Sequence, residues 1–222
     1  KHPKMSKKFS NKLKLISKEE TTGVTKVTIS NNNASNIIYC ENGTLEIYDA
    51  NITLNSVSSS KAVIYATTKG ANVGNVILSG VTLTNNSSTS AEKYSGIYND
   101  NGIITVKNGT TIENEFGSIG IMLNNGTFNI AGNVNIIDQV NFANNSSKIT
   151  VTSPINMDDE ENKIKLNINP KMHKDSNVVV TYLASAGTPQ LDKFFVSLAS
   201  GFTLEINEQD LVLRKQDYKE YS

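Results

Sequence analysis

The sequence is poor in cysteine, in charge and in long apolar runs, and each shortage excludes a class of protein. Cys40 is the single cysteine, so the chain forms no internal disulfide. Charged residues make up 19% of the chain and its formal net charge is zero, whereas a nucleic-acid-binding protein needs a strong basic excess. No apolar run approaches the roughly 18 residues of a membrane-spanning helix. We therefore expect no nucleic-acid partner and no membrane span.

Neutral polar residues take the place of charge. Asn alone occupies 30 of the 222 positions. Apolar residues make up 37% of the chain, below the roughly 45–50% that is usual when glycine is also counted. Ile, Val and Thr nevertheless occur throughout, and these β-branched residues argue against disorder and favour strands.

Four segments of the chain share one pattern. Each has an anchor isoleucine, then a glycine, then two apolar residues separated by one position, and the anchors lie 26, 33 and 24 residues apart. The segments are 37–47, 63–78, 96–106 and 120–130, with anchors Ile38, Ile64, Ile97 and Ile121 and glycines Gly43, Gly74, Gly102 and Gly126.

A period in the twenties with apolar residues at every second position predicts stacked β-coils rather than helical repeats. In a parallel β-helix, equivalent residues of successive coils form columns about 4.8 Å apart. We expect the alternating residues to stack in the interior, and a second turn followed by a third apolar pair to close each unit. The interior residues predicted in this way are Leu45, Ile47, Val76, Leu78, Ile104, Val106, Phe128 and Ile130. The second turn is predicted at Ala50, Gly80, Gly109 and Gly132, and the third pair at Ile52/Leu54, Val81/Leu83 and Val134/Ile136.

The stretch "SGIYNDNGIITVKNGTTI" (95–112) contains Asn-Gly pairs between strand-like segments. Such pairs usually mark hairpins. Their recurrence in the repeat predicts corners of a coil instead, with Asn42, Asn101 and Asn125 in one column whose side chains bond to one another. The insertions 67–74 and 84–96 are predicted to be surface loops, because they are rich in Ser, Thr, Asn and Gly.

"GIYNDNGIITVKNGTTI" (96–112) resembles the Gly-Ala-Ile-Tyr-Asn-Asn-Gly-Thr-Leu-Thr-Ile repeats of bacterial adhesin-like right-handed β-helix proteins. These are secreted or surface proteins, similar in style to polymorphic outer-membrane and autotransporter passenger domains. The resemblance covers about residues 35–155, although the chain lacks the doubled glycine and the alanine before the anchor. It implies an all-β fold, a right-handed single-stranded parallel β-helix with a C-terminal β cap, and an extracellular or cell-surface location in a bacterium.

The repeat region has two flanks. Residues 1–30 are predicted to be a basic N-terminal flank or cap, with seven lysines in the first 18 positions. Residues 31–155 are predicted to form the β-helix repeats. Six short strand candidates lie between residues 148 and 214, and residues 156–216 are predicted to be further coils and a β cap of the same solenoid, because open solenoid ends expose strand edges. Residues 217–222 form a tail.

The chain offers no constellation for catalysis. Glycan cleavage needs paired carboxylates, or carboxylates that bind Ca²⁺ together with a basic residue. The acidic residues of the repeats share no column in the alignment, and Arg214 is the only arginine. "MDDEEN" (157–162) lacks the spacing of a Ca²⁺ loop and is predicted to be a solvated turn. We expect no catalytic residue, no metal site and no cofactor.

One feature predicts a binding surface. Three tyrosines directly follow their anchors and should stack in one column: Tyr39, Tyr65 and Tyr98. If the anchors point inward, the tyrosines form an outward aromatic ladder of the kind on which sugars lie. If the register is reversed, they form an interior stack. Asn99 favours the reverse because it shares the parity of Ile97, whereas Cys40, Ala66 and Leu123 favour inward isoleucines.

The expected function is that of an adhesin-like module that binds host protein or glycan through one face or its loops. One alternative is a carbohydrate-active β-helix enzyme, a polysaccharide lyase or hydrolase, for which a cluster of carboxylates on one outer sheet would be the sign. The other is a structural stalk without a ligand. The sequence leaves the oligomeric state open.

Overall fold

The computed structural model describes residues 13–16, 19–20, 23–24, 26–58, 61–114, 118–156, 163–197 and 200–216. Within these ranges the chain is all-β, and the helical turns are short 3-10 turns that begin after residue 169. Residues 1–12 of the basic flank, the acidic segment 157–162 and the tail 217–222 lie outside the described residues. The three 3-10 turns are η1 (Pro170–Met172), η2 (Ala184–Ala186) and η3 (Leu191–Lys193).

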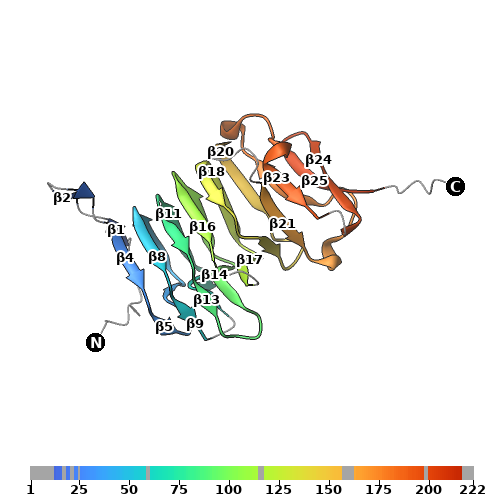
Figure 1. Ribbon diagram of the computed structural model, residues 1–222. Coiled ribbons are helices and arrows are strands. Elements are labelled where there is room, and N and C mark those ends of the chain that lie inside the picture. The colour runs from blue at the N-terminus through green and yellow to red at the C-terminus, as the bar shows by residue number, and fades with distance from the viewer. Residues whose placement is uncertain are drawn as a thin grey trace.

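Most strands belong to three stacks of parallel strands, which the chain visits in turn; stacks 1 and 3 continue into the orange C-terminal part of the molecule, whereas stack 2 ends at the yellow strand β18 (Figure 1). Stack 1 consists of β1 (Leu13–Ile16), β7 (Gly43–Tyr48), β11 (Asn72–Ser79), β15 (Ile103–Lys107), β18 (Thr127–Ile136), β20 (Ile149–Asn156) and β22 (Val178–Tyr182). Stack 2 consists of β4 (Val27–Ser30), β8 (Ala50–Thr53), β12 (Thr82–Thr84), β16 (Thr110–Glu113) and the end of β18. Stack 3 consists of β6 (Ile38–Cys40), β10 (Ile64–Lys69), β14 (Tyr94–Asp100), β17 (Ile119–Asn124), β19 (Val140–Phe142), β21 (Ile164–Ile168) and β23 (Phe194–Val196).

Two smaller groups complete the strands. Three short strands form a further parallel group between stacks 2 and 3: β5 (Asn33–Ala34), β9 (Ser56–Val57) and β13 (Ser87–Ser88). An antiparallel pair, β2 (Glu19–Glu20) and β3 (Gly23–Val24), lies near the N-terminal end.

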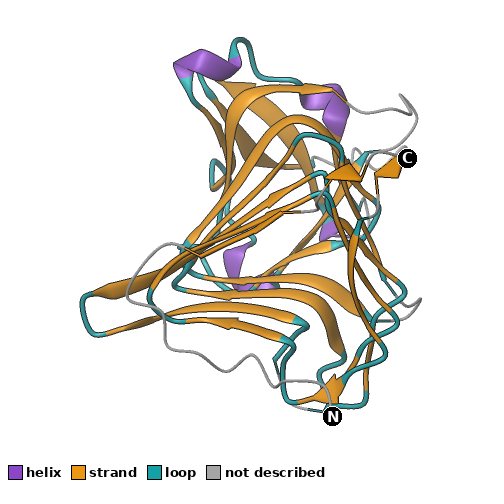
Figure 2. Ribbon diagram, turned by 90° about the vertical axis from the view of Figure 1, so that its left-hand side faces the viewer, coloured by secondary structure: helices purple, strands orange, loops and turns teal. Residues whose placement is uncertain are grey.

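The stacks surround one hydrophobic core (Figure 2). Seven of the eight predicted interior residues are at most 1% exposed, and Leu45 is partly buried against the same core. Their registers agree with the prediction: the Cα partners in one column are Leu45, Val76, Ile104 and Phe128, and those in the next are Ile47, Leu78, Val106 and Ile130. Each fully buried aliphatic side chain contributes roughly 1.5–3 kcal/mol, so these columns supply much of the stability.

The prediction that the Asn-Gly pairs form corners is confirmed. Asn101 lies between β14 of stack 3 and β15 of stack 1, and the strands that flank it pair with other repeats. Asn101 and Asn125 both have φ of 65°, a left-handed conformation that Asn tolerates better than most residues. The predicted hydrogen bonds along this column are wrong, because the Asn101 amide donates to Asp100 of its own turn.

The asparagine column that does bond lies at another corner, between stack 2 and the short parallel group. Each side-chain amide donates to the Oδ1 of the next residue at 2.8–3.0 Å, and the last donates to Asp138 Oδ2 at 2.6 Å. Each backbone N–H donates to the same neighbour at 2.9–3.2 Å. We call this set the asparagine ladder: Asn32, Asn55, Asn86, Asn114 and Asp138.

The third apolar pair of the first repeat is predicted incorrectly. Leu54 is 57% exposed with φ of 56°, and Ile52 is the Cα partner of Leu83. The turn before it is formed by Asp49 at φ 48°, while Ala50 points into the core. The alternation of inward and outward residues is the same whether the inward pair is Ile52 and Leu54 or Ala50 and Ile52. Only the stacking against the next coil therefore decides between these two registers.

The two insertions are more ordered than the predicted loops. The end of β10 and the start of β11 pair antiparallel, so residues 67–74 form a hairpin that turns at Gly70 with φ of 62°. The second insertion contains β13, which adds a strand to the short parallel group.

The C-terminal end replaces parallel pairing with antiparallel pairing. β25 (Asp210–Lys215) pairs antiparallel with β22 and with β24 (Phe202–Asn207) at the end of stack 1. The Gln190 side chain accepts from the Ile155 N–H at 2.9 Å and donates to the Ile155 carbonyl at 3.1 Å, as a paired strand would. Among the described residues, no helix is both long and apolar enough to cross a membrane.

Candidate ligand-binding face

The structure decides the register that the sequence left open. Ile64 and Ile97 are fully buried in the core and Ile38 is 6% exposed, so the anchors point inward. Asn99 also points inward and is fully buried, and its amide donates to the Thr127 carbonyl at 2.9 Å. The predicted tyrosines therefore lie on the outer surface of stack 3.

These tyrosines are Cα partners in adjacent strands and their rings touch. The ring centroids of Tyr39 and Tyr65 lie 5.4 Å apart, and those of Tyr65 and Tyr98 lie 5.6 Å apart. Tyr94 adds a fourth ring, 5.0 Å from Tyr98. Sequence alignment missed Tyr94 because an irregularity of register separates it from Ile97. We call these four residues the tyrosine column.

Exposure varies along the tyrosine column. Tyr39 is 46% exposed, whereas Tyr65 is only 8% exposed although it faces outward. The Lys61 ammonium lies 4.5 Å from the Tyr65 ring centroid and 4.7 Å from that of Tyr98, which is a cation–π arrangement. The middle of the column is therefore covered, and a ligand has access to its two ends.

Two carboxylates flank the tyrosine column. The Tyr39 hydroxyl donates to Glu41 at 2.7 Å, and the Tyr65 hydroxyl donates to Asp100 at 2.9 Å. Lys69 lies 3.9 Å from Glu41, and Lys61 lies 3.9 Å from Asp100.

The prediction that the acidic residues share no column is wrong for one pair. Asp100 is the Cα partner of Thr67, and Glu41 follows Cys40, the partner of Ala66. Both carboxylates therefore occupy the same outer position, two strand spacings or roughly 10 Å apart. Alignment hid the pair because the intervening repeat has a threonine there.

The pKa values of three phenols of the tyrosine column, those of Tyr39, Tyr94 and Tyr98, are raised, which favours their neutral form. Burial and the hydrogen bond to Glu41 raise the pKa of Tyr39 to about 12. Burial, the Asp100 charge and the neighbouring rings raise the pKa of Tyr98 to about 12. Burial also raises the pKa of Tyr94. At neutral pH the face offers uncharged aromatic surfaces with hydroxyl groups.

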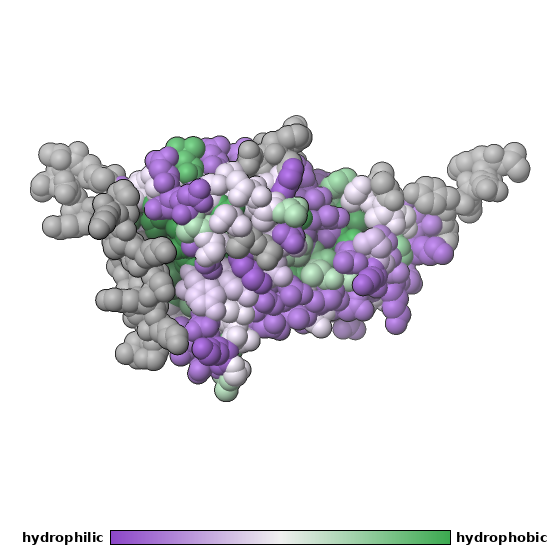
Figure 3. Space-filling model, turned by 90° about the horizontal axis from the view of Figure 1, so that it is seen from below, coloured by the Kyte–Doolittle hydropathy of each residue, from purple (hydrophilic) through white to green (hydrophobic). Residues whose placement is uncertain are grey.

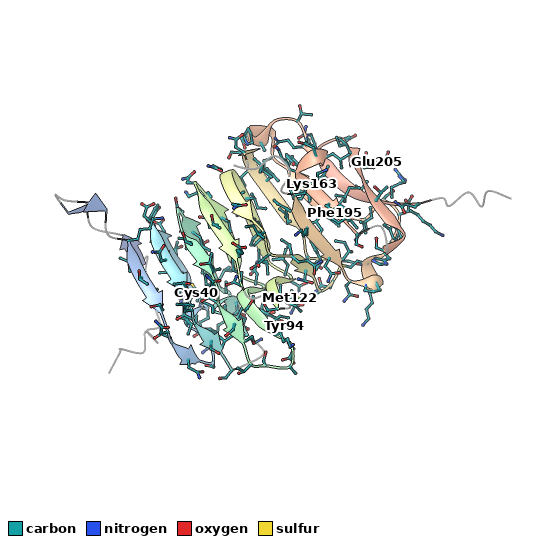
Figure 4. The ribbon with its side chains drawn as sticks, viewed as in Figure 1. Cys40, Tyr94, Met122, Lys163, Phe195 and Glu205 are labelled. Atoms are coloured by element: carbon teal, nitrogen blue, oxygen red, sulfur yellow. The ribbon has the colours of Figure 1, made fainter. Side chains whose placement is uncertain are left out.

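A groove of about 400 Å³ begins where the tyrosine column ends. It crosses β14, β17, β19 and β21, which are neighbours in stack 3. Tyr94 and Tyr98 form one end of its lining, Met122 lies next to them, and Figure 4 shows Tyr94 and Met122 close together. Further apolar lining comes from Ile119, Phe142, Ala143, Ile168 and Pro170, and four amides complete it: Asn124, Asn141, Asn167 and Asn169.

The amides of the groove are oriented by hydrogen bonds. Asn141 is 4% exposed and donates to the Ile121 and Gln139 carbonyls at 3.2 and 3.1 Å. Its Oδ1 accepts from Asn167 at 2.6 Å. Asn124 donates to Asp100 at 3.0 Å, which connects the groove to the tyrosine column.

The described residues show little that resembles a catalytic or metal centre. Burial raises the pKa of the Cys40 thiol, which disfavours the reactive thiolate. No group of three or more His, Cys, Asp and Glu side chains gathers within the described ranges in a way that could hold a metal ion.

Comparison of the chain with known protein families, with curated proteins and with solved structures gives no match.

Proposed function

We propose that this chain is an adhesin-like module of a secreted or surface-exposed bacterial protein, folded as a right-handed parallel β-helix, that binds a glycan through the outer face of stack 3. The repeated passage through three parallel stacks supports a β-helix. Right-handedness follows the general rule for crossovers between parallel strands. The location follows from the resemblance of the repeats.

The observation that carries the binding function is the tyrosine column with the groove at its end. Neutral aromatic rings offer flat apolar surfaces with a polar rim, and such rings are enriched at binding sites. The groove volume of about 400 Å³ falls in the range of small-ligand sites, roughly 300–1,000 Å³.

A glycan fits this face better than a host protein. Stable protein interfaces have an apolar core inside a polar rim. Figure 3, viewed from the side where β13, β14 and β17 lie in Figure 1, shows a mostly hydrophilic surface with small separate hydrophobic areas.

The test is retention of the purified chain on a panel of glycans and matrix proteins. Tyr98→Ala and Tyr94→Ala should weaken binding at least tenfold. Tyr48→Ala is the matched control, because Tyr48 is on stack 1 and its hydroxyl donates to Glu46 at 3.3 Å, as Tyr39 does to Glu41. Equal losses in all three variants would contradict the assignment of the face, and no retention on any ligand would favour the stalk.

The shared position of Glu41 and Asp100 favours a second candidate, the carbohydrate-active enzyme. Two carboxylates on one face are the minimum for acid–base cleavage of a glycosidic bond. The same panel should be checked for shortened products. Cleavage that is lost in Asp100→Asn and Glu41→Gln would replace the adhesin proposal with this one.

A further inference from the structure

We infer that the groove beside the tyrosine column selects an uncharged, hydroxyl-rich glycan chain that runs along the stacking direction. This inference rests on the proposed function and specifies the chemistry of its ligand. Three properties of the groove support it: the absence of charge, the amide groups in its wall and its direction relative to the strands.

The groove has no charged wall. Its described lining consists of aromatic, aliphatic and amide side chains, without Asp, Glu, Lys, Arg or His. A carboxylate or ammonium group that leaves water for such a wall loses hydration and finds no opposite charge among the lining side chains, which is unfavourable. An uncharged sugar carries no such penalty, so the groove discriminates against uronic acids and free amino sugars.

The amides provide the hydrogen bonds that hydroxyl groups need. Asn167 is exposed, and its Nδ2 donates to Asn141 while its Oδ1 has no partner among the described residues. Asn169 accepts from the Lys171 N–H at 3.0 Å, and its Nδ2 has no partner within the same ranges. Asn167 thus offers an acceptor and Asn169 a donor, and a hydroxyl group can bond to either of them because it both donates and accepts.

The direction of the groove sets the orientation of the chain. Four neighbouring strands span three strand spacings, roughly 14 Å. Tyr94 and Tyr98 lie at one end with rings inclined by 60°, and the free amide groups of β21 and the following residues lie toward the other. A glycan therefore stacks at the tyrosines and continues across β17 and β19 to the asparagines.

The opposite end of the tyrosine column has different chemistry. Glu41 and Lys69 lie beside Tyr39, and the Lys61–Asp100 pair lies beside Tyr65, between that end and the groove. A charged ligand would find its counter-charges there rather than in the groove, so charge selectivity distinguishes the two positions.

The experiment measures binding of size-matched oligosaccharides of three kinds: uncharged hexose oligomers, oligouronates and deacetylated amino-sugar oligomers. Met122 is the Cα partner of both Tyr98 and Asn141, at the centre of the groove, and Met122→Lys places a charge there. Ile77→Lys is the matched control, because Ile77 is an outward, partly exposed apolar residue of stack 1. Tyr39→Ala probes the charged end of the face.

We expect only the uncharged oligomers to bind, with affinity that rises with chain length and levels off once the chain exceeds the groove. Met122→Lys should reduce this binding at least tenfold, while Ile77→Lys and Tyr39→Ala leave it within twofold. Preferred binding of oligouronates or amino sugars, or binding that depends on Tyr39 and not on Met122, overturns the inference but keeps the proposed glycan function. Failure of all three kinds to bind contradicts both.

Discussion

Two columns of like residues run along this molecule, and they differ in what their polar groups contact. In the asparagine ladder, Asn55 and Asn86 are at most 1% exposed and each amide bonds to the next residue of the ladder. In the tyrosine column, the rings touch each other while Tyr39 remains 46% exposed. A repeated residue thus becomes part of the scaffold when its partners are other copies of itself. It becomes a candidate site when part of its surface is left to solvent.

The largest expected loss of stability comes from a substitution in an interior column. It sets the scale for the losses expected in the asparagine ladder and in the tyrosine column. Phe128→Ala removes a fully buried ring between Ile104 and Ile149 and should lower the free energy of unfolding by about 3–5 kcal/mol. Chemical denaturation followed by circular dichroism measures the change. A loss below about 1 kcal/mol, the range of surface substitutions, would contradict the assigned core.

Breaking the asparagine ladder should be the next most costly change. Asn86→Ala removes the acceptor of the Asn55 N–H and one acceptor of the Asn55 amide, which keeps its bonds to the Ile29 and Thr53 carbonyls. We expect a loss of about 2–4 kcal/mol in the free energy of unfolding. Asn51→Ala on the outer surface of β8 is the control and should change stability by no more than about 0.5 kcal/mol. Equal effects at Asn51 and Asn86 would remove the structural distinction between ladder and surface asparagines.

Substitution in the tyrosine column should change stability little and ligand binding strongly. Tyr98→Ala should cost about 1 kcal/mol of stability through its ring contacts, because the ring is only partly buried. The same substitution should weaken glycan binding at least tenfold, as measured by calorimetric titration. A stability loss as large as that of Phe128→Ala would show that Tyr98 is a core residue instead of a ligand contact.

The smallest effect is a pH dependence. The pKa of Tyr98 is raised from 10.0 to about 12 in the folded state, so the neutral phenol is favoured by folding. This contribution to stability is fully present below about pH 10 and is lost as the pH rises toward about 12. Stability measured at about pH 9 and about pH 11.5 should therefore fall less in Tyr98→Phe than in the unmodified chain. A residual fall is expected, because burial also raises the pKa of Tyr182 to about 12.

The repeats allowed much of the fold to be predicted. Period-two alternation identified the interior residues of stack 1, and the recurring glycines identified one set of corners. Prediction failed at Leu54 and Ala50, because a shift of two residues in a short strand leaves the alternation unchanged. It also missed the asparagine ladder, whose members lie 23, 31, 28 and 24 residues apart and stand outside the aligned segments.

The candidate site was less predictable than the fold. The three predicted tyrosines do lie in one column. Whether that column faces inward or outward depends on which of the two alternating sets of strand residues fills the core. Met122 directly follows the anchor Ile121, as the tyrosines follow theirs, but it is not aromatic; Tyr94 and the asparagines of the groove had no shared spacing to mark them. Glu41 and Asp100 were separated by a repeat that carries Thr67 at the same position.

The sequence alone determined that this chain forms parallel strands with apolar residues on one side, because alternation and turn residues are local properties. Only the tertiary structure decided which tyrosines are open, which asparagines bond to one another and where the uncharged groove lies. These depend on contacts between residues more than twenty positions apart, and the exact coil lengths that bring such residues together are not encoded in any local pattern.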